Sequence, residues 1–195
     1  MTTVLLVRHG ETDTVHTILS GRASIGLNEA GRWQAETLAR YFGPIAVDTV
    51  LSSPVERARQ TAEAITSAKH LALQIDERLN EIDFGHWSGR SFAELDGDPL
   101  FSQWNSQRAS CRAPGGERMQ DVQMRAAELM AALCQTAELA IAVTHADVIK
   151  AVVCGTLGLS LNAHHRFAID PASITTLRSR GQEWALVRLN EAPHG

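Results

Sequence analysis

The stretch Val4–Thr12, VLLVRHGET, decides how the chain is expected to fold. Its first four residues, Val4–Val7, are all apolar, which is typical of a β-strand buried on both faces. The run stops abruptly at Arg8, His9 and Gly10. Open parallel α/β sheets bind ligands beyond the carboxyl ends of their strands. We therefore expect the rest of the chain to be arranged around the point where His9 leaves this strand.

A second strongly apolar run lies far away in the sequence and ends in the same way. Leu139–Val143 is followed by Thr144 and His145. Two runs this apolar belong in the middle of a sheet, where both faces are covered. Parallel neighbours end at the same edge, so we expect His9 and His145 to face one cavity.

Apolar strands alternate with amphipathic helices along the chain, which predicts an α/β fold. We expect a three-layer α/β/α sandwich with a mainly parallel central sheet, formed as a single domain over residues 1–195. Predicted helices cover Asn28–Phe42, with Asn28 as cap, Pro54–Ala68, with Pro54 in the first turn, Glu117–Gln135 and Ala146–Leu157. Further predicted strands cover Val47–Ser53, Leu71–Ile75, Arg166–Asp170, Ile174–Ser179 and Trp184–Leu189, and residues 192–195 are expected to fray.

The segment from Ser91 to Gly116 is the least regular part of the chain. Short helical pieces are expected around Phe92–Leu95 and Pro99–Trp104. An irregular segment beside a strand end is a natural rim for a ligand site. We expect Trp104 to pack in the core or the lid, and among the tryptophans it is the best candidate for lining the mouth of the cavity.

Composition excludes several classes of function. The net charge of −4 does not favour nucleic acid as a partner, because a polyanion-binding protein shows a basic stripe. No apolar run approaches the roughly 20 residues of a membrane span, so no membrane is expected as a partner. The three cysteines match no metal-binding spacing, and we expect reduced thiols, a cytoplasmic protein and no metal or other cofactor. The closing hairpin is the surface that we would expect to pair in a homodimer.

The polar groups expected at the cavity suit one kind of ligand. Arg8 and His9, Arg57, Glu81 and His145 come from four separate stretches of the chain. Guanidinium groups fit phosphate oxygens bidentately, and a neutral imidazole can accept a phosphoryl group. A protonated carboxyl can supply a proton to a leaving oxygen. The set therefore predicts a site for a tetrahedral dianion.

These stretches, taken in order, resemble the histidine phosphatase superfamily, which is also called phosphoglycerate mutase-like. One RHG triplet is a weak signal, but the ordered set spans nearly the whole chain. The matching residues are Arg8–Thr12, Ser52–Pro54 with Arg57-Ala58 and Gln60–Ala62, Leu79–Glu81 with Phe84-Gly85 and Trp87–Gly89, Pro114–Glu117, and Thr144-His145 with Val148-Ile149. The nearest likeness is to small, broad-specificity or α-ribazole-phosphatase-like members of branch 1.

The resemblance implies a role for each matching residue. His9 is the expected nucleophile that becomes phosphohistidine, and Glu81 is the expected general acid. Arg8, Arg57 and His145 are expected to clamp the phosphoryl oxygens. Further phosphate-binding candidates are the backbone N–H of Ala146 and residues Thr12, His16, Gly21 and Arg22.

The chain also departs from the family pattern. Members often have an asparagine where this chain has Val15 and His16, so His16 is a candidate for that phosphate contact. Asp147 stands where a glycine is common and adds a negative charge near the cavity. Asp83 is the alternative acid to Glu81. Arg22, Arg90, Arg108, Arg112 and Arg118 are candidates for binding a charged group of the substrate, although each is an ordinary solvated arginine on the simpler interpretation.

The resemblance implies hydrolysis of small phosphorylated metabolites, but two alternatives stay open. A 2,3-bisphosphoglycerate-dependent phosphoglycerate mutase would need a longer enclosing segment than Ser91–Gly116. An inactive phosphate-binding scaffold would need the arginines but not Glu81.

Overall fold

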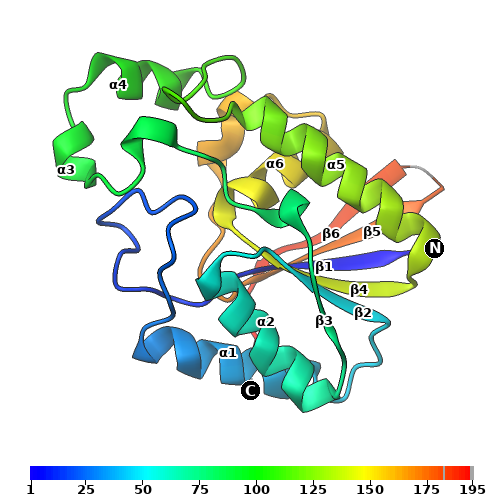
Figure 1. The fold of residues 1–195 in the computed structure, drawn as a ribbon. Coiled ribbons are helices and arrows are strands. Elements are labelled where there is room, and N and C mark those ends of the chain that lie inside the picture. Colours follow the sequence, from blue (N-terminus) through cyan, green and yellow to red (C-terminus); the bar gives the residue numbers. More distant parts are fainter. Residues whose placement is uncertain (182, 194–195) are drawn as a thin grey trace.

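A computed structural model describes residues 1–181 and 183–193 of the chain, so the expected fraying of residues 192–195 lies partly outside the described residues. Figure 1 shows a six-stranded sheet with strand order β3-β2-β4-β1-β5-β6. Its strands are β1 (Thr3–Arg8), β2 (Thr49–Ser52), β3 (Leu73–Ile75), β4 (Leu139–Thr144), β5 (Ile174–Arg180) and β6 (Glu183–Glu191). β3, β2, β4 and β1 are parallel, whereas β5 runs antiparallel to both β1 and β6.

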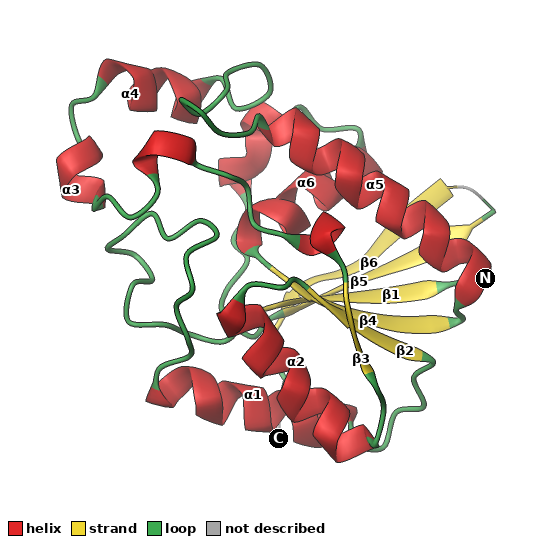
Figure 2. Cartoon of the chain, in the orientation of Figure 1, coloured by secondary structure: helices red, strands yellow, loops and turns green. Residues whose placement is uncertain are grey.

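Helices cover both faces of this sheet, as the red and yellow elements of Figure 2 show. α1 (Glu29–Phe42) and α2 (Glu56–Lys69) pack on one face, and α5 (Met119–Thr136) and α6 (Ala146–Leu157) pack on the other. Alternate side chains of β1 point into the two resulting cores: Val4 and Leu6 face α5 and α6, whereas Val7 faces α1 and α2. The predicted three-layer sandwich is confirmed, with a mixed sheet because β5 is antiparallel to both of its neighbours.

Local signals account for most helix ends. The side chain of Asn28 accepts a hydrogen bond from the Gly31 N–H at 2.8 Å and caps α1 as predicted. Gly158 ends α6 with φ +64°, a conformation that favours glycine. The prediction that Pro54 lies in the first turn of α2 is wrong. Ser53 Oγ accepts the N–H of Val55 at 3.2 Å, Val55 stays extended as the cap, and the helix begins two residues after Pro54.

The predicted strand Arg166–Asp170 is also wrong. Residues Leu161–Arg166 form a short 3₁₀ helix, and an irregular connection follows before β5 begins. β1 is already paired on both edges, by β4 and by β5, so no strand position beside it is left. The connection serves another purpose, because the carbonyl of Ile169 accepts a hydrogen bond from Arg8 Nη1 at 2.6 Å.

Residues 91–116, which we call the cap, lie beyond the carboxyl ends of β1 and β4 (Figure 1). They contain α3 (Phe92–Leu95) and α4 (Pro99–Ser106). Trp104 packs in the core, as expected, and is not the residue that lines the cavity: it is 1% exposed and packs against Trp87 and Phe101. Burial of this large apolar ring stabilises the packing of the cap against the core. No helix in the described ranges is long and apolar enough to cross a membrane.

Candidate active site

The two histidines meet at the centre of the sheet edge, as predicted. β1 and β4 pair in parallel with Arg8 opposite Thr144, so the next residue of each strand is a histidine. The rings of His9 and His145 are 5.1 Å apart between centroids. Both side chains are buried, at 4% and 0% exposure.

Hydrogen bonds determine which nitrogen of His9 carries the proton. Nδ1 lies 2.7 Å from the carbonyl oxygen of Gly10, and a carbonyl only accepts, so Nδ1 is the donor. Nε2 therefore holds a lone pair, which accepts a hydrogen bond from Arg57 Nε at 3.0 Å. Burial lowers the pKa of His9 well below its usual value, and the positive charges of Arg57 and Arg8 lower it further. The ring is thus a neutral nucleophile with Nε2 directed at the cavity.

Arg57 connects both histidines to the neighbouring loop. It is the second residue of α2 and is 3% exposed. Its Nη2 donates to the carbonyl of Gly21 at 2.6 Å and to Nδ1 of His145 at 3.1 Å. This guanidinium is therefore held in one orientation, in which its donors can be shared with a bound oxyanion.

The tautomer of His145 follows from the same argument. Arginine can only donate, so Nδ1 of His145 accepts and Nε2 carries the proton. Nε2 donates to Ser53 Oγ at 2.9 Å, and Ser53 Oγ donates to Asn80 Oδ1 at 3.2 Å. Burial, followed by the charge of Arg57, lowers the pKa of His145 well below its usual value. The ring is therefore neutral.

Glu81 supplies the one carboxyl group of this cluster. It is 8% exposed, and its Oε2 lies 4.0 Å from Nδ1 of His145. Burial raises the pKa of Glu81 to about 7, and the nearby charge of Asp147 adds to this rise, against the opposing effect of Arg57, the Ile82 N–H and Arg8. A carboxyl with this pKa can donate a proton near neutral pH and take it back. The alternative acid, Asp83, uses its Oδ1 to accept the Gly85 N–H at 2.8 Å.

A cavity of about 200 Å³ brings most of the predicted site residues together. Its wall includes His9, Arg8, Arg57 and Glu81, together with the phosphate-binding candidates Thr12, His16 and Gly21. His145 lies behind Arg57 in the buried layer. Ala146 begins α6 directly after it, so the positive end of a 12-residue helix is directed to the site.

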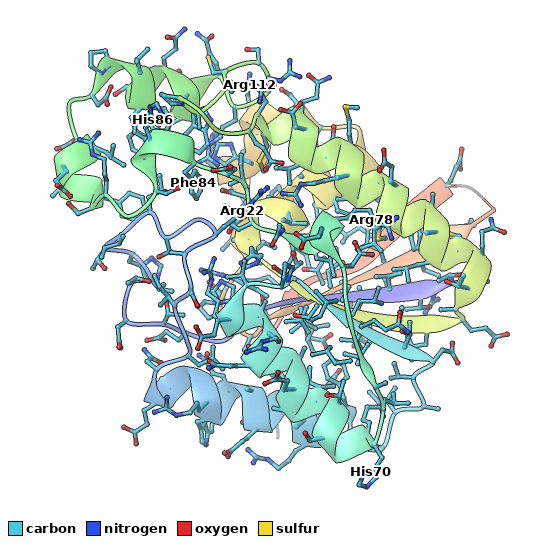
Figure 3. All side chains as sticks on the ribbon, viewed as in Figure 1. Arg22, His70, Arg78, Phe84, His86 and Arg112 are labelled. Atoms are coloured by element: carbon cyan, nitrogen blue, oxygen red, sulfur yellow. The ribbon has the colours of Figure 1, made fainter. Side chains whose placement is uncertain are left out.

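Arg22 does not line this cavity. Its Nη2 donates to Glu117 Oε2 at 2.8 Å and its Nε donates to the carbonyl of Glu81 at 2.9 Å. Arg22 borders a neighbouring hollow of about 340 Å³ that contains neither His9 nor Glu81. The contacts of Arg22 hold the backbone of Glu81 in place, and none of them is directed into the cavity that contains His9. Figure 3 places Arg22 between the cap and α2, with Phe84 near it and Arg112 on the outer side of the cap.

The sequence did not identify Ser53 as the partner of His145, nor the hydroxyl groups of Thr14 and Ser20 in the cavity wall. Ser53 could have been found, because it directly follows the end of β2, which pairs with β4. Thr14 and Ser20 lie in a loop of turns and bends, where no periodicity indicates which side chains face inwards.

Comparison with known proteins agrees with this geometry. The family model described as the histidine phosphatase superfamily (branch 1) matches residues 4–192. Phosphoserine phosphatase 1 of Hydrogenobacter thermophilus is 28% identical over 199 positions, covering 100% of this chain and 94% of that protein. The adenosylcobalamin/α-ribazole phosphatase of Escherichia coli is 30% identical over 170 positions, covering 85% and 84%. A mutant phosphoserine phosphatase from Entamoeba histolytica, in complex with phosphoserine, superposes with a TM-score of 0.88 at 29% identity, covering 98% of both chains.

Proposed function

The chain belongs to branch 1 of the histidine phosphatase superfamily, and on that premise we propose that it works through a phosphohistidine formed on Nε2 of His9. It is a phosphatase that hydrolyses phosphate monoesters of small metabolites. The observation that carries the mechanism is that a neutral imidazole nitrogen and a carboxyl with a pKa of about 7 share one small cavity.

In the first step, the lone pair of His9 Nε2 attacks phosphorus and forms a P–N bond. The bond from phosphorus to the ester oxygen breaks, and that oxygen takes the proton of Glu81 and leaves as the alcohol. Arg8 and Arg57 neutralise the phosphoryl oxygens, and His145 accepts a hydrogen bond from Arg57 through Nδ1 and so holds that guanidinium in place. The backbone N–H of Ala146, at the N-terminus of α6, directs a further partial positive charge towards the phosphoryl group.

In the second step, the carboxylate of Glu81 takes a proton from water while the water oxygen attacks phosphorus. The P–N bond breaks, inorganic phosphate leaves, and His9 returns as the neutral ring with its proton on Nδ1. Glu81 is then protonated again, as its raised pKa favours. The cycle balances without any metal-bound or redox step.

The test is to trap the intermediate. The chain is mixed with 4-nitrophenyl phosphate, quenched in base within milliseconds to seconds, digested and analysed for a phosphorylated peptide that contains His9. We expect acid-labile phosphate at His9 and no turnover by His9→Ala. The matched control is His70→Asn, since His70 lies at the far end of α2 in a left-handed conformation that asparagine accepts (Figure 3). Turnover by His9→Ala at the wild-type rate would reject the mechanism.

The same preparation also separates the two alternatives. Phosphoglycerate mutase turnover that rivals hydrolysis, with 2,3-bisphosphoglycerate present, would favour the mutase. Phosphate binding without any hydrolysis between pH 5 and 8 would favour the scaffold.

We further propose one catalytic domain over residues 1–195, a cytoplasmic location and a homodimer. The three cysteines are free, which supports a reducing compartment. β6 forms an edge of the sheet, which supports pairing between two copies. Sedimentation at micromolar concentration tests the dimer, and a monomer at all concentrations would reject it.

A further inference from the structure

We propose that the natural substrate is a monoester of an uncharged alcohol, with hydroxyl groups or an apolar ring on the leaving group and no second anionic group. This inference rests on the proposed function, because it assigns the part of the same cavity that receives the leaving group. It follows from the chemistry of the wall beyond the phosphoryl-binding residues.

One side of that wall is a row of hydroxyl groups. Thr12 Oγ1 lies 3.1 Å from Thr14 Oγ1, and Thr14 Oγ1 lies 2.8 Å from Ser20 Oγ. All three residues line the cavity. A hydroxyl can turn to donate or accept, so this row suits an uncharged hydroxyl group of a substrate.

Apolar side chains make up another part of the wall. Val15, Ile18, Leu19, Phe84 and Phe92 all line the cavity. The loop that carries the first three is joined to residues 90–92 by backbone hydrogen bonds, from Leu19 N–H to Arg90 at 2.9 Å and from Phe92 N–H to Thr17 at 3.0 Å. These residues therefore offer carbon surface to a leaving group.

The described part of this wall offers no further lysine or arginine to a second anion, and its remaining imidazole, His16, is a candidate contact for the phosphoryl group. Within residues 1–181 and 183–193, Arg8 and Arg57 are the only lysine or arginine residues that line the cavity, and both serve the phosphoryl group. The five arginines that the sequence suggested for a substrate charge all have carboxylate partners: Arg22 with Glu117 at 2.8 Å, Arg90 with Asp98 at 4.0 Å, Arg108 with Asp147 at 3.1 Å, and Arg112 and Arg118 with Asp121 at 3.0 and 2.8 Å.

Arg108 is the example among these arginines with the most contacts that hold its side chain in place. It is 9% exposed, and its guanidinium carbon lies 3.6 Å above the ring of Trp104. Its Nη2 also donates to Asn105 Oδ1 at 3.1 Å. Recruiting it for a substrate carboxylate would remove the ion-pair partner of the half-buried Asp147, which is costly.

A carboxylate placed in this mouth would lose water and gain no opposite charge, whereas an uncharged hydroxyl would find partners in Thr14 and Ser20. The size of the cavity adds a limit. About 200 Å³ is below the roughly 300–1,000 Å³ of pockets for drug-sized ligands, so it holds the phosphoryl group and the nearest atoms of the alcohol.

Two matched pairs of substrates test the inference on the wild-type chain. Glycerol 3-phosphate and 3-phosphoglycerate differ by a hydroxymethyl group against a carboxylate. Phosphoethanolamine and phosphoserine differ by the carboxylate alone. At pH 7.5 we expect kcat/KM to be at least about 10-fold higher for the member without the carboxylate. Equal values, or a preference for the carboxylate in either pair, would overturn the inference.

A gain-of-charge variant makes the test independent of the natural substrate. Val15→Arg places a cation in the wall, and we expect it to raise kcat/KM for 3-phosphoglycerate relative to glycerol 3-phosphate by about 10-fold. The control, Arg112→Ala, removes an exposed and paired arginine and should leave the ratio unchanged. A folded Val15→Arg chain with an unchanged ratio, or a changed ratio in Arg112→Ala, would contradict the assignment of the wall.

Failure of the inference can be told apart from failure of the proposed function. If 4-nitrophenyl phosphate and all four metabolites are inert, the phosphatase mechanism itself is rejected. If they are turned over without a preference for the members that lack the carboxylate, only the substrate class is rejected.

Discussion

The Nε–H group of Arg57 donates a hydrogen bond of 3.0 Å to Nε2 of His9, the nitrogen that is directed at the cavity. The nucleophilic lone pair is thus kept free of a proton and pointed at the arginine that will bind the phosphoryl group. When a phosphate ester enters, the guanidinium can exchange this bond for a charged one to oxygen. The site is therefore arranged in advance for attack on phosphorus.

Replacing Arg57 tests this arrangement. We expect Arg57→Lys to lower kcat by about 10²–10³-fold, the usual effect of losing one preorganised donor to a developing anion. Lysine is a point charge and cannot hold His9, His145 and the Gly21 carbonyl together. Steady-state kinetics with 4-nitrophenyl phosphate gives the measurement. The control is Arg59→Lys on the exposed side of α2, and equal effects of the two variants would contradict the role.

The pH profile tests Glu81. Because the pKa of Glu81 is about 7, the fraction able to donate a proton falls as pH rises through 7, and kcat/KM for an alkyl phosphate should fall with it. Glu81→Gln should lower kcat for that substrate by about 10²–10⁴-fold. The loss should be smaller for 4-nitrophenyl phosphate, whose leaving group needs no proton. An equal loss for both substrates would argue against a role as acid.

Stability should fall with acid because of the two histidines. His9 and His145 have lowered pKa values when folded and ordinary values when unfolded, so their contribution is present above about pH 6.5 and is lost as pH falls. The raised pKa of Glu81 has the opposite sign, with stability lost as pH rises towards 7. Because the two effects oppose each other, the free energy of unfolding of wild type is best compared with that of a variant that lacks one of these groups.

We expect the free-energy gap between wild type and His9→Ala to narrow as pH falls below about 6.5, with a slope of at most about 1.4 kcal/mol per pH unit for one proton. Urea unfolding at several pH values measures this gap. A free-energy gap that does not change with pH would show that the pKa of His9 is the same in the folded and the unfolded chain, and would contradict the prediction.

Gly85 and Gly89 provide a matched pair for the loop that carries Glu81. Both have positive φ, at +54° and +83°, but a Cβ on Gly85 would lie 2.1 Å from the Pro114 carbonyl oxygen, whereas one on Gly89 would have open space. We expect Gly89→Ala to cost about 1–2 kcal/mol from strain alone. Gly85→Ala should cost clearly more, since the backbone of the cap must also move. Thermal unfolding compares them, and equal losses would contradict the close approach.

Much of the framework could be predicted from local patterns. The apolar runs before His9 and His145 correctly indicated two central parallel strands, because only a doubly covered strand tolerates so few polar residues. Asn28 and Gly158 correctly marked helix ends, because capping depends on one or two neighbouring residues. The strand predicted at Arg166–Asp170 failed because pairing depends on which sheet edges are free, and a sequence does not show that.

By itself, the sequence determined the fold class, the meeting of His9 with His145 and the set of groups that can hold a phosphate, since each follows from strand ends and residue chemistry. Only the tertiary structure decided how those groups are used. It showed which nitrogen of His9 carries no proton, and it showed that Glu81 is buried, which raises the pKa of this carboxyl to about 7. It also showed that Arg108 of the cap forms an ion pair with Asp147 of α6. The physical reason is that tautomers, pKa values and ion pairs depend on distances of a few ångströms between residues far apart in the chain.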